Sequence, residues 1–100
     1  MESHYFNLIR TWGLQKGIPI KGDPKTQSIK AMEELGELAH AILKNDKEEI
    51  SDAIGDVVIV LTNLAAMYNM NIENCIKDSY DVVSKRSGNM INGTFVKDKK

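Results

Sequence analysis

Two long segments of helical periodicity, residues 24–44 and 46–69, follow one another with only Asn45 between them. In both segments apolar residues recur at steps of three and four, the spacing of one face of an α-helix. Asp23-Pro24 supplies a capping oxygen and a proline at the first helical position, and Asp46 can cap the second segment. The chain is therefore predicted to contain two long amphipathic helices joined by a tight turn.

Shorter helical patterns flank this pair. A first helix is predicted from Ser3, as N-cap, to Gly17, and residues 18–22 are expected to form a loop because Pro19 disfavours helix. Asn71 can cap a fourth helix that ends near Gly88. The fold class expected is all-α, with a four-helix-bundle-type domain over residues 1–88.

The last twelve residues, 89–100, are expected to be an irregular basic tail with a turn at Asn92-Gly93. One hundred residues make a single small domain, near the lower limit for a self-sufficient hydrophobic core. A partner subunit would help to bury the apolar faces. We therefore expect oligomerisation to complete the domain, as a homodimer or a homotetramer.

Charge and composition exclude several classes of partner. Thirteen basic residues balance fourteen acidic ones, so the chain lacks the basic character typical of a nucleic-acid-binding domain. Cys75 is the single cysteine, which indicates a reducing compartment. The first residues lack the pattern of a signal peptide, and the longest aliphatic run is Val57–Leu61, too short to span a membrane. We expect a cytoplasmic protein with no membrane or nucleic-acid partner.

Acidic residues concentrate in the two long helices. The first cluster is Glu33-Glu34-Leu35-Gly36-Glu37, and the second holds Glu49, Asp52 and Asp56 on one stripe that continues to Asn63. Within residues 31–43 and 48–56 the only basic side chain is His40, so the charge is uncompensated. Two such helices laid together would form an oxygen-lined cage for a hard divalent cation, Mg²⁺ or Mn²⁺.

A simpler interpretation is that both clusters are solvated helix faces. Two details favour a site. Opposite charges at four-residue spacing, which stabilise an exposed helix, are missing from the clusters. Each cluster also contains a mid-helix glycine, Gly36 or Gly55, which costs about 1 kcal/mol relative to alanine and suggests close backbone approach. Metal-assisted hydrolysis directed at phosphate is the chemistry that these carboxylates suit best.

The motif Glu33-Glu34-x-x-Glu37, followed by Ala53-Ile54-Gly55-Asp56-Val57, resembles the MazG-like all-α nucleoside triphosphate pyrophosphohydrolases, whose motif is EExxE, a spacer and ExxD. The likeness extends from Trp12-Gly13 to Gly93-Thr94-Phe95, and it is to small stand-alone and phage-type members. It implies Mg²⁺-dependent hydrolysis of a nucleoside triphosphate substrate to the monophosphate and pyrophosphate. House-cleaning of damaged nucleotides and control of a normal pool both remain open.

The resemblance also implies roles for individual residues. Glu34 and Glu37 would be metal ligands, Glu33 the catalytic base or water-orienting group, and Asp56 the terminal aspartate of the motif. Ala53 stands where the ExxD glutamate is expected. Asp52 is one replacement, and Glu49 with Asp52 is another, although Glu49 also occupies the capping-box position after Asp46.

Four residues are expected to contact substrate. Lys44 and Asn63 would meet phosphate or sugar, and Lys85 and Arg86 would neutralise triphosphate charge. Two other functions stay open: a phosphoribosyl-ATP pyrophosphohydrolase-like activity, and a non-catalytic helical interaction or regulatory module that presents its acidic stripe to a basic partner.

Overall fold

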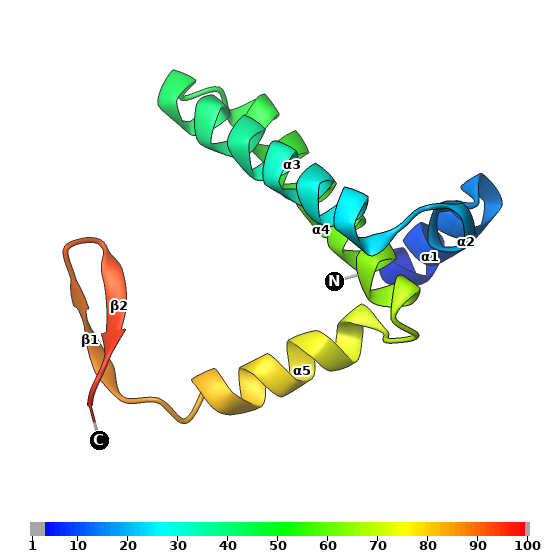
Figure 1. Cartoon of the computed structure of the whole chain (residues 1–100). Helices are drawn as coiled ribbons and strands as arrows, with labels where there is room; N and C mark the ends of the chain where they lie inside the picture. The colour runs from blue at the N-terminus through cyan, green and yellow to red at the C-terminus, as the bar shows by residue number, and fades with distance from the viewer. Residues whose placement is uncertain (1–3, 100) are drawn as a thin grey trace.

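The computed structural model describes residues 4–99, so the N-cap expected at Ser3 lies outside the described residues. The elements are, in order, α1 (His4–Lys16), α2 (Ile18–Lys21), α3 (Pro24–Lys44), α4 (Lys47–Met67), α5 (Ile72–Val83), β1 (Gly88–Ile91) and β2 (Thr94–Lys97). Figure 1 shows α3 and α4 side by side, α1 and α2 at one end of this pair, and α5 leading away to the hairpin. The all-α fold class is confirmed.

The predicted helix starts are confirmed by their caps. Asn45, with a left-handed φ of 56°, ends α3, and Asp46 then begins α4. Each capping side chain accepts a hydrogen bond from the backbone N–H three residues later: Asp23 from Thr26, Asp46 from Glu49, and Asn71 from Asn74. These bonds satisfy amides that have no partner inside the helix.

Two boundaries differ from the prediction. The segment expected to be a loop forms the short helix α2, because Gly17 turns the chain with a φ of 78° and Pro19 falls in the first turn, where a helix needs no N–H. The fourth predicted helix, which is α5, ends at Val83 and not near Gly88 as expected.

The tail is not irregular, since its residues form an antiparallel hairpin. Gly88 pairs with Lys97, and Ile91 pairs with Thr94 across a two-residue turn. Asn92 and Gly93 have φ values of 51° and 85°, which fit the type I′ turn that suits the twist of a hairpin. The turn was predicted correctly, but the strands on either side of it were not.

Small residues line the contact between the helices. The buried apolar side chains among the described residues are Ala31, Ala41, Ala53, Val60 and Ala65, and the buried polar ones are Glu34, Thr62 and Asn63. Thr62 Oγ1 donates a hydrogen bond of 2.7 Å to the Val58 carbonyl oxygen, which satisfies the hydroxyl inside its own helix. The α3–α4 pair therefore packs closely and positions the carboxylates described below.

The two mid-helix glycines do not mark close backbone approach within this chain. A Cβ atom added at Gly36 or Gly55 would meet nothing within 4 Å. That expectation was wrong, because α3 and α4 touch along their alanine-rich flanks instead. Gly13 of α1 does lie against α4, because a Cβ atom there would meet the side chain of Asn63.

Among the described residues, α4 alone is long and apolar enough to cross a membrane by length and composition. Core helices of soluble proteins have the same properties, and α4 packs against α1, α2, α3 and α5. We therefore interpret α4 as the central helix of the fold.

Candidate functional site

Carboxylates of α3 and α4 converge near the middle of the helix pair. Glu34 of α3 is buried, with 7% of its surface exposed. Burial raises the pKa of Asp56 on α4, and the negative charges of Asp52 and Glu34, together with a hydrogen bond to Glu34, raise the pKa further. Three of the predicted metal ligands therefore influence one another across the helix contact.

A lysine that the sequence analysis missed accompanies this group. Lys30 Nζ lies 3.7 Å from Glu34 Oε1, one helical turn earlier on α3, and its charge opposes the rise in the Asp56 pKa. The four-residue spacing was visible in the sequence, but Lys30 falls just before the acidic cluster and was left outside it. With one lysine beside three carboxylates, the group keeps a net negative charge when all four side chains are ionised.

A pocket of about 430 Å³ opens beside these carboxylates. Its lining has an apolar part, Trp12, Ile18, Ile59 and Val60, and a polar part, Lys30, Glu34, Asp56 and Asn63. The apolar part comes from α1, α2 and α4, and the polar part comes from α3 and α4. The pocket thus places an aromatic ring and carboxylates around one space, an arrangement typical of small-molecule sites.

Asn63 contributes a buried hydrogen-bond acceptor to this lining. Its side chain is 2% exposed, and its Nδ2 donates a hydrogen bond of 3.1 Å to the Ile59 carbonyl oxygen. Among the described residues, Oδ1 has no hydrogen-bond partner. A Cβ atom on Gly13 would overlap this oxygen, so the glycine is required where α1 crosses α4. Oδ1 therefore faces α1, and its burial without a partner is a cost that the packing of α1 on α4 must offset.

The remaining acids of the two clusters lie elsewhere on the same helix pair. Glu33, Glu37 and Glu49 line a separate depression together with Gly36 and His40. Lys44 Nζ lies 3.0 and 3.1 Å from the two carboxylate oxygens of Glu49, so these two predicted site residues pair with each other. The structure brings Glu34, Asp52 and Asp56 together and does not bring Glu33, Glu37, Glu49 or Lys44 into their pocket.

The described part of the chain contains no group of three or more His, Cys, Asp or Glu side chains arranged to hold a metal ion. The closed cage expected from the sequence is therefore not formed by residues 4–99 of one chain. Mg²⁺ is often held by one or two carboxylates, with water and substrate phosphates completing its shell. Glu34 and Asp56, with Asp52 nearby, fit that open mode of binding.

Lys85 and Arg86 lie beyond the end of α5. They line a basic depression with Ser87, Lys97 and Lys99, where Asp98 is the acidic member. Neither strand of the hairpin makes extensive contact with α3 or α4. Within one chain, these two predicted phosphate contacts are separate from the carboxylates.

Comparison with known proteins agrees with the motif. A curated relative, an uncharacterized 18.2 kDa protein of the rep-hol intergenic region of Haemophilus phage HP1, is 39% identical over 57 residues. The match covers 57% of this chain and 35% of the relative, so the chain spans about a third of that protein's length. No solved structure matches significantly. The family model for the MazG nucleotide pyrophosphohydrolase domain matches residues 23–91, from the cap of α3 to the end of β1, and the chain belongs to this family.

Proposed function

We propose that this protein hydrolyses a (deoxy)nucleoside triphosphate to the monophosphate and pyrophosphate in the presence of Mg²⁺ or Mn²⁺. Membership of the MazG family supports the reaction class. The observation that carries the proposal is the pocket in which Glu34 and Asp56 share one space with Trp12 and Asn63.

The carboxylates of this pocket are the proposed metal ligands. Glu34 and Asp56 would hold the ion, and Asp52 would add negative charge or a further ligand. When bound, the ion supplies positive charge that offsets the phosphates and activates the attacking water. Lys30, which reaches Glu34, would neutralise part of the triphosphate charge.

Glu37 and Glu33 keep their proposed roles as second ligand and as base. They adjoin Glu34 along α3 but line the neighbouring depression, so Glu37 would hold a second ion there and Glu33 would orient the water beside it. Lys44 and Glu49 are weaker candidates for substrate and metal contact because they are paired with each other.

The nucleoside would occupy the apolar side of the pocket. Trp12 offers a ring for stacking, and Ile18 lies on the same side of the pocket. Asn63 lines the same pocket, and its Oδ1 is covered by Gly13 of α1. Both Trp12 and Ile18 precede the region that the family model matches, so we propose that α1 and α2 set the base preference of this member.

A pyrophosphate-release assay over normal and modified nucleotides, with and without Mg²⁺, tests the function. Glu34→Gln and Asp56→Asn should each lower kcat/KM by about 100-fold or more, the scale of losing one electrostatic contact to the reacting phosphates. Glu48→Gln removes an exposed carboxylate from the first turn of α4 and is the matched control. Hydrolysis that survives in both pocket variants would contradict the proposal.

Metal binding can be measured apart from catalysis. Because a ligand that binds only the folded state stabilises it, millimolar Mg²⁺ should raise the melting temperature of the wild-type protein but not that of Asp56→Asn.

A non-catalytic helical module would show neither the Mg²⁺ response nor the activity. Including phosphoribosyl-ATP among the assayed substrates tests the phosphoribosyl-ATP pyrophosphohydrolase-like activity separately. A cytoplasmic location and a nucleotide-pool role belong to the same proposal.

A further inference from the structure

Two contacts hold α1 against the rest of the fold, and they lie one helical turn apart. Gly13 has no side chain where α1 crosses α4, and a Cβ atom there would overlap the amide of Asn63. Arg10, three residues earlier, reaches Glu73 in the first turn of α5. The helix α1 is therefore attached to α4 directly through Gly13 and indirectly through α5.

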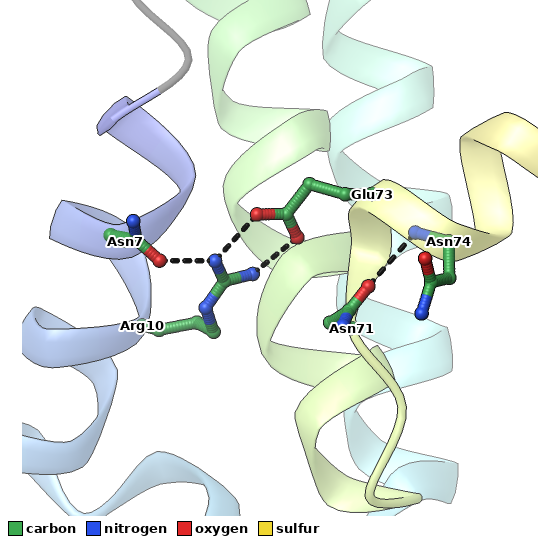
Figure 2. Close-up of polar contacts among 5 residues, drawn as sticks. All are labelled: Asn7, Arg10, Asn71, Glu73 and Asn74. Carbon is green, nitrogen blue, oxygen red and sulfur yellow. Dashed lines mark hydrogen bonds and ion pairs between the residues drawn. The ribbon is translucent and has the colours of Figure 1, made fainter.

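The ion pair has a geometry that sets orientation as well as distance. Arg10 donates hydrogen bonds of 2.6 Å to both carboxylate oxygens of Glu73, one from each terminal nitrogen (Figure 2). One of these nitrogens also donates to Asn7, one turn earlier on α1. The side chains of Arg10 and Glu73 are 24% and 42% exposed, so the pair is partly shielded from water. A planar guanidinium held at two oxygens keeps one orientation, which a contact between two point charges would not impose.

Glu73 is a firm anchor because the connection from α4 to α5 is short and hydrogen-bonded. Just beyond α4, the backbone N–H of Met70 donates a hydrogen bond of 3.0 Å to the Ala65 carbonyl oxygen. Asn69 turns the chain with a left-handed φ of 57°, and the side chain of Asn71 caps the first turn of α5. Glu73 follows the cap by two residues. The backbone at Glu73 therefore has a defined place relative to the end of α4.

Trp12 projects from the opposite flank of α1. At 100° per residue, Arg10 lies roughly 60° to one side of Gly13, and Trp12 lies roughly 100° to the other side. Trp12 lines the carboxylate pocket with Glu34 and Asp56, and it is 44% exposed. One helix thus carries an ion pair on one flank and a wall of the pocket on the other.

The glycine contact alone leaves α1 able to rotate about its own axis. Ridges of side chains set the rotation of packed helices, and Gly13 supplies no side chain at the crossing point. A helix with its side chains has a radius of about 5–6 Å, so a rotation of roughly 10° displaces a side chain by about 1 Å. A displacement of about 1 Å can slow an enzyme by about 100-fold. The ion pair of Arg10 and Glu73 is placed to prevent this rotation.

We propose that Arg10 and Glu73 are positioning residues, whose ion pair sets the rotation of α1 and thereby holds the Trp12 ring in the wall of the carboxylate pocket. Neither charged side chain lines that pocket, so the pair acts on a bound nucleoside only through Trp12. The stacking of a base on Trp12 rests on the proposed function, whereas the effect of the ion pair on the ring does not.

Fluorescence tests the position of the ring without relying on activity. Trp12 is the single tryptophan of the chain, so tryptophan emission reports on this ring alone. In Glu73→Gln the emission maximum should shift and quenching by acrylamide should increase, while the circular dichroism of the helices stays unchanged. Asp81→Asn breaks an exposed ion pair with Lys77 inside α5 and is the matched control, for which we expect wild-type emission. Unchanged emission and quenching in Glu73→Gln would overturn the proposal.

Arg10→Lys separates the geometry of the ion pair from its charge. Lysine keeps the positive charge but lacks the planar fork that holds both carboxylate oxygens. We expect Arg10→Lys to fold as the wild-type protein does and to show increased quenching of Trp12. The Arg10→Lys/Glu73→Gln double variant should show no more quenching than Glu73→Gln, because both lack the same contact. A wild-type spectrum in Arg10→Lys, or additive changes in the double variant, would show that the contact does not set the rotation of α1.

Kinetics test whether the position of the ring matters to the substrate. In the pyrophosphate-release assay, Glu73→Gln should raise KM for the nucleoside triphosphate by about 5-fold or more, the scale of losing one stack between a base and an aromatic ring. The value of kcat should stay close to wild type, because Glu34 and Asp56 lie on α3 and α4 and keep their places. An unchanged KM, or a loss confined to kcat, would contradict a role through Trp12.

Removing the ring isolates the route by which the ion pair acts. Trp12→Ala should itself raise KM, and adding Glu73→Gln should raise it no further, because the pair then has no ring to position. A further rise in KM would show that the pair reaches the substrate by another route and would overturn the proposal. If the wild-type protein hydrolyses no nucleotide, the proposed function fails, while the fluorescence of Trp12 still decides whether the ion pair positions the ring.

Discussion

Asn63 of α4 keeps its position because α1 carries no side chain at Gly13. The amide is almost fully buried, and its one recorded hydrogen bond runs from Nδ2 to the carbonyl oxygen of Ile59. The other end of the amide lies against the α1 backbone. A single glycine thereby sets how closely α1 approaches the pocket.

Gly13→Ala should destabilise the fold by about 1–3 kcal/mol, the cost of forcing an extra methyl into a packed contact. Gly36→Ala is the matched control, because a Cβ there meets nothing within 4 Å. Removing a mid-helix glycine at that position should stabilise the protein by up to about 1 kcal/mol. Urea unfolding of both variants measures the difference, and equal midpoints would contradict this account of Gly13.

The sequence indicated part of the carboxylate site. Glu34 and Asp56 belong to recognisable motifs, and their convergence follows from two amphipathic helices packed side by side. Lys30 was missed because a lysine one turn before an acidic cluster is normally a simple helix-surface pair. The separation of Glu33 and Glu37 from Glu34 could not be predicted, since it depends on how far α3 is rotated against α4.

At the scale of the elements, Arg10 and Glu73 join α1 to α5 across 63 positions of sequence. The hydrogen bonds from Arg10 lower the pKa of Glu73 below its ordinary value of 4.5. Because the folded-state pKa is depressed, the pair contributes its full stability above pH 4.5 and loses it as the pH falls through the folded-state value. Acid should therefore loosen the attachment of the first turn of α5 to α1.

Hydrogen exchange measures this release. Amides in the first two turns of α5 should exchange faster in Glu73→Gln at neutral pH, and the wild-type protein should approach that behaviour as Glu73 is protonated. Asp81→Asn breaks the exposed pair between Lys77 and Asp81 within the same helix and is the control, because exposed pairs of this kind add little stability. Equal protection in all three proteins would show that the ion pair does not hold α5 against α1.

The helices were more predictable than the hairpin. Asp23, Asp46 and Asn71 cap helices through hydrogen bonds three residues away, so the signal and the structure lie within one turn of chain. The strands are four residues each and lack a clear alternating pattern, and only their turn at Asn92-Gly93 has a strong local signature. The turn was therefore predicted while the strands were not.

At the scale of the whole molecule, large apolar side chains stay exposed on α5, such as Ile76 and Tyr80, and on the α3–α4 pair, such as Met32 and Ile54. If a second copy covers them, unfolding is coupled to dissociation, and stability depends on protein concentration. Between about 1 and 100 μM protein, the melting temperature should rise by about 3 °C for each tenfold increase. Calorimetry over this range measures the slope, and a melting temperature that does not change would indicate a monomer.

The sequence by itself determined the all-α class, the starts of α3, α4 and α5, and the acidic character of α3 and α4. These properties depend on contacts within a turn or two of helix. Only the tertiary structure decided which carboxylates meet, where Trp12 and Asn63 lie relative to them, and how α5 leaves the fold. Those outcomes depend on the rotation of packed helices and on contacts such as that between Arg10 and Glu73, which no local pattern records.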